Sequence, residues 1–562
     1  MKYAPGLALL LASWLQPLHV LPWVSWHSEV LAFAAVLWWF GAELASARKG
    51  GQRTFVAPVA VIVPLALAAL ALLQFATGLI QYLGDALIIS LYLATCSMAV
   101  AVGHAWAGQP AQTRSSEEEY PLLQQLALVV LVAAVASVLI ALVEVFRVWE
   151  QLEWIVRPPS FRRPGGNIGQ PNNLATLVLM GVASLAYLFE GRRVSASLAA
   201  FLMALLTLGL AMTESRTALL SAAALSAWWF YKRRLLNAKV RPAALAAAWA
   251  GWLILLWAWP QVAASFHFVD RQVVDTTPGL RLVVWPQFLE AAMQHPWFGW
   301  GLREVSRAHN AVLDHYQSAE PFTYAHNIVL DFVVGMGFPL TVLVLGGLTY
   351  WACKRLRAVQ SPATWYCVAL AIPLSVHAML EYPFAYAYLL FPVMLAVGYL
   401  EGSLAPNSAL KVATRWPLIA TPLVLALMVW SALEYVRAEE DFRIARFEAL
   451  RIGKTQDDYT QPELYLLTQL KAMLAATRMT PKTGMSSEDI ELLRRAATRF
   501  PWTAIQNRYA LALALNGNPD EAMRQLRVMR AMHGEKHYKA LKAAWQEYAQ
   551  DKYPQLAQLA LP

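Results

Sequence analysis

The chain has 562 residues, of which 58% are hydrophobic and only 14% charged, and its mean hydropathy is +0.42. This composition excludes a soluble enzyme with one large core and indicates a polytopic membrane protein. The net charge of +9 does not indicate nucleic-acid binding, because Lys and Arg occur in small groups between apolar runs. No cysteine falls in the large polar segments, which argues against a disulfide framework or a cysteine metal site.

Apolar runs predict about thirteen membrane-spanning helices, since about 20 apolar residues cross a bilayer. The first run lacks a convincing cleavage site and is expected to be a retained helix. We therefore expect an all-α, polytopic membrane helical bundle. The predicted spans lie near residues 5–22, 28–45, 56–75, 84–105, 122–146, 173–189, 195–213, 217–231, 243–260, 327–350, 364–381, 385–401 and 416–436.

The Lys and Arg residues orient these spans with the N-terminus inside, because the short loops expected inside are basic. The outside segments are then 76–83, 147–172, the long loop 261–326, the short turn at Tyr382-Pro383 and everything after about 437. Segment 147–172 breaks the charge rule, since it carries Arg162 and Arg163 among other arginines. Such a segment requires either a different topology or an anionic partner, and we favour the partner.

The composition changes after the last span, and residues 437–562 are expected to form a soluble helical domain. Residues 502–522 resemble one tetratricopeptide unit, with small residues for close helix packing and a Gly-Asn-Pro-Asp turn. One unit cannot bury its own face, so helices near 462–476 and 487–499 must pack against it. An unrelated helical hairpin is the alternative. Residues 1–436, including the loop 261–326, would form the membrane domain.

The stretch 270–337 places His326 and Asn327 where a polar loop meets a membrane helix on the outside face. His326 could accept a proton, donate to a leaving phosphate, or cap the helix. Arg216 lies between two apolar runs, where an arginine usually meets an anion or a carboxylate; the alternatives are an ion pair with Glu214 or a capping role. Arg281 lies in the stretch 279–285, whose apolar residues suggest a helix along the membrane surface. Guanidinium groups bind phosphate oxygens bidentately, which suits a diphosphate.

Two further polar groups fall at span ends on the same face. The amides of Gln170, Asn172 and Asn173 could bind sugar hydroxyls or cap the span that follows. His377 and Glu381, followed by Tyr382, are spaced to share one helical face, so a simple His–carboxylate pair is the alternative there. No phosphate loop, zinc spacing or nucleophilic serine elbow competes with these residues.

At these residues the chain resembles the bacterial PglL-type O-oligosaccharyltransferases of the O-antigen ligase and polymerase superfamily. The matching stretches are Gly169-Gln170-Pro171-Asn172-Asn173, Glu214 to Leu219, Arg281 to Trp285 with Pro296 to Gly301, Ala325-His326-Asn327 and His377 to Pro383. Any one stretch is a weak signal, but all of them occur in order on one side of the membrane.

The resemblance implies a GT-C-like enzyme of the bacterial inner membrane, with its active site and C-terminal domain in the periplasm. It implies transfer of a glycan from undecaprenyl-diphosphate to Ser or Thr of an exported, pilin-like protein, without a cofactor or metal. In this hypothesis Arg216 and Arg281 hold the diphosphate and His326 acts on the acceptor hydroxyl or the donor. The other named residues would shape the sugar and acceptor pocket, with membrane lipids around it.

Other functions remain open from the sequence. A ligase of the same superfamily would transfer the glycan to lipid A-core, and a polymerase would transfer it to another glycan. A lipid or glycan transporter would use Arg and Glu at span ends to line a path. An envelope scaffold would tolerate changes at His326 and the arginines.

Overall fold

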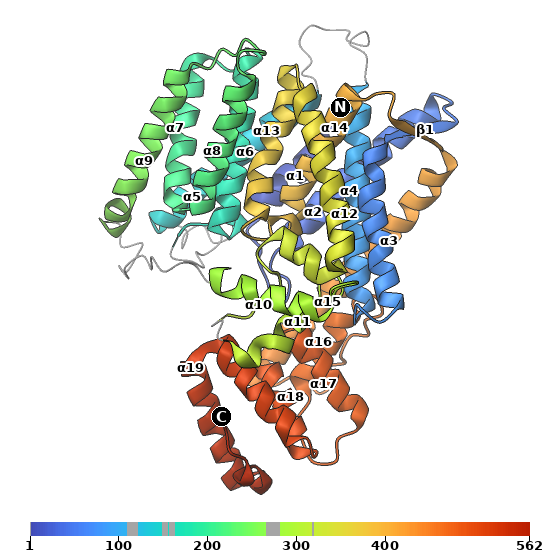
Figure 1. Ribbon diagram of the computed structural model, residues 1–562, viewed down its shortest axis with the longest axis vertical. Helices are drawn as coiled ribbons and strands as arrows, with labels where there is room; N and C mark the ends of the chain where they lie inside the picture. Colours follow the sequence, from blue (N-terminus) through green and yellow to red (C-terminus); the bar gives the residue numbers. More distant parts are fainter. Residues whose placement is uncertain (1, 109–121, 149–154, 157–162, 266–280, 317–319) are drawn as a thin grey trace. The chain divides into compact units, whose positions relative to one another are not determined.

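The computed structural model describes residues 2–108, 122–148, 155–156, 163–265, 281–316 and 320–562, and this part of the chain is almost entirely helical (Figure 1). The helices in the membrane-predicted part are α1 (Ala4–Leu15), α2 (Trp26–Lys49), α3 (Ile62–Ala76), α4 (Leu83–Ala107), α5 (Leu122–Val145), α6 (Pro171–Glu190), α7 (Ala196–Thr213), α8 (Arg216–Lys232), α9 (Pro242–Ser265), α12 (Ile328–Ala358), α13 (Pro362–Ala378), α14 (Ala387–Leu404) and α15 (Arg415–Leu450). The remaining helices are α10 (Arg281–Gln294), α11 (Val305–Val312), α16 (Thr468–Arg478), α17 (Ser487–Arg499), α18 (Thr503–Leu515) and α19 (Pro519–Asp551).

Each predicted span corresponds to a helix, which confirms the all-α membrane fold. Among the described residues, ten helices are long and apolar enough to cross a bilayer. The other three predicted spans are α1, α8 and α13, with 12, 17 and 17 residues. The first expected span, 5–22, is longer than α1, which stops at Leu15. Gln16 is extended, as expected for a residue before proline, because Pro17 disfavours the helical conformation there.

The helices form two compact units, the first of which comprises residues 1–67, 91–274 and 349–426. Helix α6 is central to this unit and packs against α5, α7, α8 and α13, while α9 packs against α7 (Figure 1). Small residues permit this close approach: a Cβ at Gly181 of α6 would lie 2.4 Å from the Ala134 Cβ of α5. A short antiparallel pair joins β1 (Thr54–Pro58) to β2 (Ala409–Ala413).

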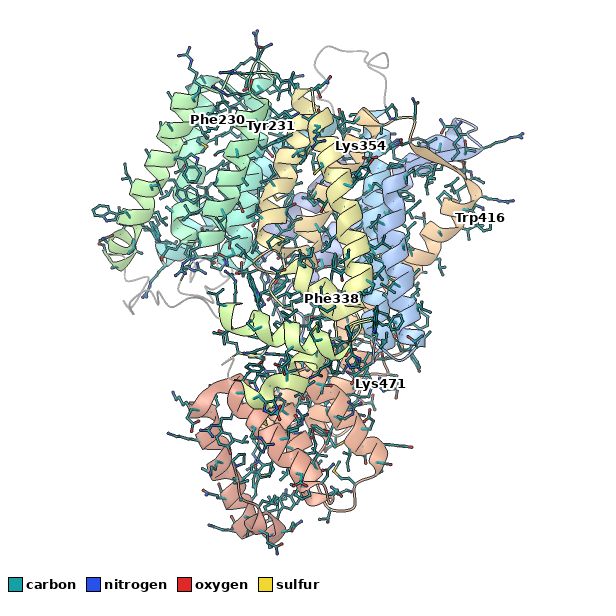
Figure 2. All side chains as sticks on the ribbon, in the orientation of Figure 1. Phe230, Tyr231, Phe338, Lys354, Trp416 and Lys471 are labelled. Carbon is teal, nitrogen blue, oxygen red and sulfur yellow. The ribbon has the colours of Figure 1, made fainter. Side chains whose placement is uncertain are left out.

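Some charged and aromatic side chains of the first unit lie near helix ends. Near the predicted inside ends, Arg355 forms a buried two-pronged pair with Glu401. The rings of Phe230 and Tyr231, at the end of α8, are 49% and 63% exposed (Figure 2), as expected for an interfacial aromatic pair. Not every aromatic residue near a span end plays this role, since Trp39 is fully buried.

The second unit comprises residues 68–90, 275–348 and 427–562. Its α10, α11 and the first half of α12 share a core that includes Val284, Phe288 and Val334. Helix α12 kinks at Gly337, where the φ of 77° and the close approach of Trp297 leave no room for a side chain. The turn at 296–300 contacts α12 on both sides of this kink. Trp300 N donates to Val334 O (2.7 Å), and Phe338 N donates to Pro296 O (2.8 Å).

The C-terminal helices α16–α19 belong to the second unit. Helix α17 begins and ends where the sequence predicts, and α18 and α19 form the expected hairpin. The expected domain boundary near residue 436 falls inside α15, which continues to Leu450. Asp85, in the first turn of α4, binds Arg499 of α17 through two hydrogen bonds of 2.7 Å, and both side chains are buried.

Candidate functional site

In the first unit, Glu381 joins the start of α6 to the end of α13. Its Oε1 accepts a hydrogen bond from Asn172 Nδ2 (2.6 Å), and its Oε2 accepts from Gln170 Nε2 (3.3 Å). His377 Nε2 lies 2.9 Å from the same Oε2. Because a carboxylate only accepts, this ring nitrogen carries a proton. We call Gln170, Asn172, His377 and Glu381 the amide–carboxylate cluster.

The residues of the cluster have structural roles as a helix cap and a His–carboxylate pair, and they also leave a carboxylate that a ligand could contact. Gln170 is the N-cap of α6, since its side-chain oxygen accepts from Asn173 N at 2.6 Å. His377 is fully buried, and its Nδ1 lies 2.8 Å from Thr176 Oγ1. Glu381 is only partly buried, and Tyr382 follows it with its ring stacked on Tyr386. The His–carboxylate pair therefore exists, and it orients a carboxylate that is accessible in part.

The glycine-rich segment before α6 is held by Glu144, a residue that the sequence analysis missed. Glu144 Oε2 accepts hydrogen bonds from Gly165 N and Gly166 N, both at 3.0 Å, and the side chain is 1% exposed. A lone acidic residue at the end of the apolar run 122–146 was the available signal, because buried carboxylates in spans need a partner. Glu144 thus positions the loop that leads to Gln170.

Arg163 supports the turn that carries Arg216. Its Nη1 donates to the carbonyl oxygens of Thr213 and Glu214, both at 3.1 Å. Glu214 adopts a left-handed conformation (φ 46°), and Ser215 caps α8 by accepting from Ala218 N. Arg216 is exposed at the first position of α8 and forms no ion pair with Glu214 or with any other described carboxylate. Arg162 lies outside the described residues.

His326, in the second unit, occupies a tightly held turn before α12. Its φ is 55°, and its ring packs edge-on against Phe322. Asn327 Oδ1 accepts from Val329 N (2.9 Å) and Leu330 N (3.3 Å), so Asn327 and not His326 caps α12. The interpretation of His326 as the helix cap is therefore wrong, because Asn327 has that role.

The hydrogen bond of His326 determines which ring nitrogen can accept a proton. Nδ1 lies 3.1 Å from the carbonyl oxygen of Tyr324, and a carbonyl only accepts, so Nδ1 carries a proton. In the neutral ring the lone pair is then on Nε2. The backbone amide of Ala325 donates to Asp331 Oδ1 at 2.9 Å, which holds the turn from the other side. A partly buried histidine with a fixed tautomer can act as a base through Nε2.

Two residues near His326 were not identified from the sequence. Asp331 lies in the first turn of an apolar span and is 8% exposed, and an acidic residue in that position is itself a signal. Arg303 donates a hydrogen bond to the hydroxyl of Tyr324 and lies over its ring. Burial raises the pKa of Tyr324, which keeps this hydroxyl neutral beside the arginine.

Arg281 is the first residue of α10, a helix that the sequence predicted around residues 279–285. Val284 and Phe288 turn inward from this helix, whereas Leu282 is 63% exposed. The predicted residues of the first unit are therefore Arg163, Gln170, Asn172, Asn173, Arg216, His377, Glu381 and Tyr382, and those of the second unit are Arg281, His326 and Asn327.

Comparison with known proteins gives matches across these stretches. Residues 164–189 match the family described as "Protein glycosylation ligase", residues 198–345 match "O-Antigen ligase", and residues 365–547 match "Virulence factor membrane-bound polymerase, C-terminal". A general O-oligosaccharyltransferase of Acinetobacter baylyi is 24% identical over 93% of this chain and 91% of its own length. The chain is a relative of the PglL-type O-oligosaccharyltransferases.

A second relative of this kind is the ComP-specific O-oligosaccharyltransferase of the same organism, 26% identical over 44% of this chain and 45% of its own length. These relatives confirm the expected enzyme class, a glycosyltransferase, in a multi-pass membrane protein. The matched segments contain the residues described above: Gln170 in the first, Arg216, Arg281 and His326 in the second, and Glu381 in the third.

Proposed function

We propose that this protein transfers an oligosaccharide from undecaprenyl-diphosphate to a Ser or Thr hydroxyl of an exported, pilin-like protein. The reaction takes place at the periplasmic face of the bacterial inner membrane. The observation that carries this proposal is the fixed tautomer of His326, whose Nε2 is the acceptor in the neutral ring. Its support is the similarity to O-oligosaccharyltransferases over most of the chain.

In the proposed reaction the acceptor oxygen attacks the anomeric carbon of the first sugar. The bond from that carbon to the diphosphate oxygen breaks, and undecaprenyl-diphosphate leaves with the electron pair. The hydroxyl proton passes to Nε2 of His326, the nitrogen that holds the lone pair in the neutral ring. Arg216 and Arg281 stabilise the negative charge on the departing diphosphate. For this leaving group, such charge stabilisation lowers the barrier more than protonation by a strong acid would.

The remaining site residues have positioning and binding roles in this proposal. Asp331 and Asn327 hold the turn that carries His326, and Arg163 holds the turn that carries Arg216. The amide–carboxylate cluster, with Asn173 and Tyr382 beside it, provides hydrogen-bonding groups for sugar or acceptor hydroxyls. Arg162 is proposed to add positive charge near the donor.

The test is an assay of the purified protein with undecaprenyl-diphosphate glycan and a pilin acceptor. We expect product from the parent and a loss of at least about 100-fold in His326→Ala and Arg281→Ala, since general-base and charge-stabilising groups each contribute about this factor. Arg530→Gln, which changes an exposed arginine of α19, is the matched control and should retain activity.

The same assay, repeated with lipid A-core as acceptor and with the protein in vesicles, distinguishes the alternatives. The O-antigen ligase match over residues 198–345 favours one second candidate, transfer to lipid A-core. Product on lipid A-core but none on pilin would support the ligase. Full activity in His326→Ala would refute the catalytic role of this histidine, and movement of the lipid carrier without any covalent product would support a transporter.

A further inference from the structure

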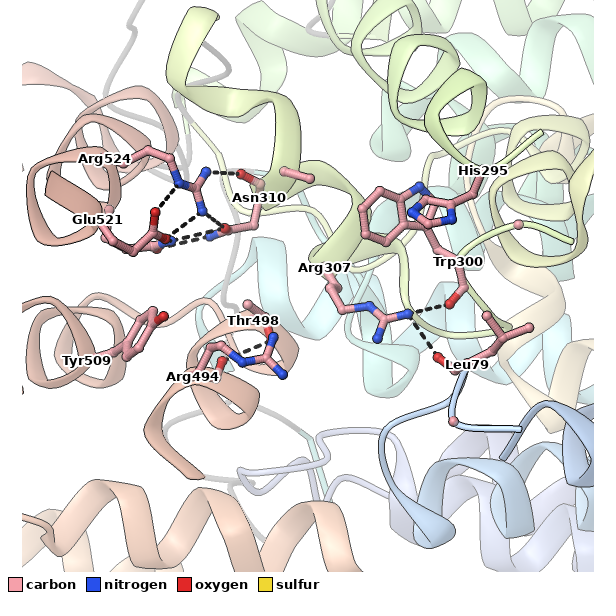
Figure 3. Close-up of a pocket in the computed structure, with 14 residues that line it drawn as sticks. Leu79, His295, Trp300, Arg307, Asn310, Arg494, Thr498, Tyr509, Glu521 and Arg524 are labelled. Carbon is pink, nitrogen blue, oxygen red and sulfur yellow. Dashed lines mark hydrogen bonds and ion pairs between the residues drawn. The ribbon is translucent and has the colours of Figure 1, made fainter. Parts of the chain in front are cut away.

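A polar pocket of about 480 Å³ lies within the second unit, among α11, α17, α18 and α19 (Figure 3). Its lining includes three arginines from three helices, Arg307 of α11, Arg494 of α17 and Arg524 of α19, and two aromatic side chains, Trp300 and Tyr509. This volume is typical of a ligand site. None of these residues belongs to the candidate site described above.

Arg307 is rigidly placed at one wall of the pocket. Its Nη2 donates to the carbonyl oxygens of Leu79 (2.9 Å) and Trp300 (2.5 Å), and its Nε lies 3.3 Å from Glu304 Oε2. Burial lowers the pKa of Arg307. The carboxylate of Glu304 raises this pKa, and the positive charges of Arg494 and Arg495 lower it further. Arg307 and Arg494 both line the pocket, so a carboxylate placed between them would be attracted by both guanidinium groups.

Arg494 faces the same pocket and keeps donor capacity. Its Nε and Nη2 bind Glu491 at 2.6 Å, while its Nη1 has no partner among the described residues. The side chain is 41% exposed, so a ligand can reach it. A guanidinium with a spare N–H in a partly dry pocket is suited to a carboxylate oxygen.

The pocket lining also includes a pair of amides. Asn310 Nδ2 donates to Gln525 Oε1, and Gln525 Nε2 donates to Asn310 Oδ1, both at the long distance of 3.3 Å. Arg524 binds the Asn310 side chain and is itself paired with Glu521 (Figure 3). Both side chains are buried (4% and 2% exposed), and Gln525 Nε2 also donates to Glu521 Oε1 at 2.8 Å, so only the two long bonds are open to exchange with a peptide group of a ligand.

The charge balance argues against a multiply charged ligand such as a diphosphate. Glu304, Glu491 and Glu521 each pair with one of the three lining arginines, so these six side chains together carry no net charge. We propose that this pocket binds an acidic side chain of the acceptor polypeptide, with its carboxylate between Arg307 and Arg494 and its backbone against Asn310 and Gln525. The inference rests on the proposed function, because the bound polypeptide would be the acceptor of that reaction.

Binding is measured with the full-length protein in detergent, by fluorescence anisotropy of a labelled Ser-containing peptide with one Asp and of the same peptide with Asn. We expect the Asp peptide to bind the parent about tenfold more tightly than the Asn peptide, and Arg494→Gln to remove this difference, as a lost charge-assisted hydrogen bond predicts. Arg494 is chosen because Glu491, its one side-chain hydrogen-bond partner among the described residues, is exposed on the same helix, so the fold does not depend on this pair.

Arg530→Gln is again the control, since Arg530 forms an equally exposed pair with Glu535 and does not line the pocket. Equal binding of the two peptides by the parent, or unchanged binding in Arg494→Gln, would overturn the proposal. Displacement of the Asp peptide by millimolar inorganic phosphate would also overturn it, in favour of a general anion site.

Kinetics separate this inference from the proposed function. We expect Arg494→Gln to raise the KM for an acidic acceptor about tenfold and to leave the KM for the lipid-linked glycan unchanged. A parent that binds the Asp peptide through Arg494 but transfers no glycan would refute the proposed function alone. A parent that transfers glycan with an acceptor KM insensitive to Arg494→Gln would refute the pocket alone.

Discussion

Replacing Glu381 by Ala removes the acceptor that joins α6 to α13, and the structure sets the size of the effect. Three donors lose their partner: Asn172 Nδ2, His377 Nε2 and Gln170 Nε2. His377 is fully buried and Asn172 is 8% exposed, whereas Gln170 is partly exposed and can bind water. Two buried donors at about 1–3 kcal/mol each predict a loss of about 2–6 kcal/mol in the free energy of unfolding.

Glu381→Gln is expected to cost less, because its side chain keeps one carbonyl oxygen. Only one of the two buried donors then lacks an acceptor, so the predicted loss is about 1–3 kcal/mol. Glu440→Gln is the control: Glu440 pairs with Arg443, both about half exposed, and such a pair contributes little to stability. Unfolding is followed in mixed detergent micelles, and glycan transfer is measured on the same preparations.

The expected order of stability is parent and Glu440→Gln, then Glu381→Gln, then Glu381→Ala. We also expect transfer activity to fall in both Glu381 variants, including Glu381→Gln assayed well below its unfolding transition. Equal stability of all four proteins would refute the reasoning, since it would mean that water replaces the carboxylate at His377 and Asn172 without cost. A stability loss with normal transfer would restrict Glu381 to a structural role.

Two further predictions concern the second unit. Arg499→Ala leaves Asp85 buried without its two-pronged partner and should lower the free energy of unfolding by about 3–5 kcal/mol. Thermal unfolding should show a large decrease in Tm. A decrease no greater than that of Arg530→Gln would contradict this prediction. Burial lowers the pKa of His309 from 6.5 to about 3, so below pH 6.5 the unfolded chain binds a proton that the folded chain excludes. The contribution of neutral His309 to the free energy of unfolding should be fully present above about pH 6.5 and fall by about 1.4 kcal/mol per pH unit toward pH 3. His309→Gln should flatten this pH dependence. An unchanged pH profile in this variant would exclude His309 as its source.

Local sequence signals predicted those parts of the site that depend on neighbours in the chain. The spacing of His377 and Glu381 was sufficient to predict their pairing, because residues four apart meet on one helical face. The starts of α6 and α8 follow their capping residues, Gln170 and Ser215, for the same local reason. The span lengths were less reliable near proline, as the early end of α1 shows.

The sequence did not reveal the long-range partners. Glu381 accepts from amides more than 200 positions earlier, and Asp85 binds an arginine 414 positions later. Arg163 is a charged residue that the sequence suggested for substrate contact, yet in the structure one of its nitrogens caps the end of α7. Which charges pair with each other depends on how helices pack, and the hydrophobic pattern that predicts a helix leaves that packing open.

The sequence by itself determined the membrane character, the helices and the position of His326 at the start of a span, because these follow from hydropathy and from residues adjacent in the chain. Only the tertiary structure decided the tautomer of His326, the role of Asn327 as the cap and the support from Asp331. It also decided which arginines line the pocket beside α11. Hydrogen-bond geometry within a turn and the meeting of distant helices depend on three-dimensional packing, which the order of residues along the chain leaves open.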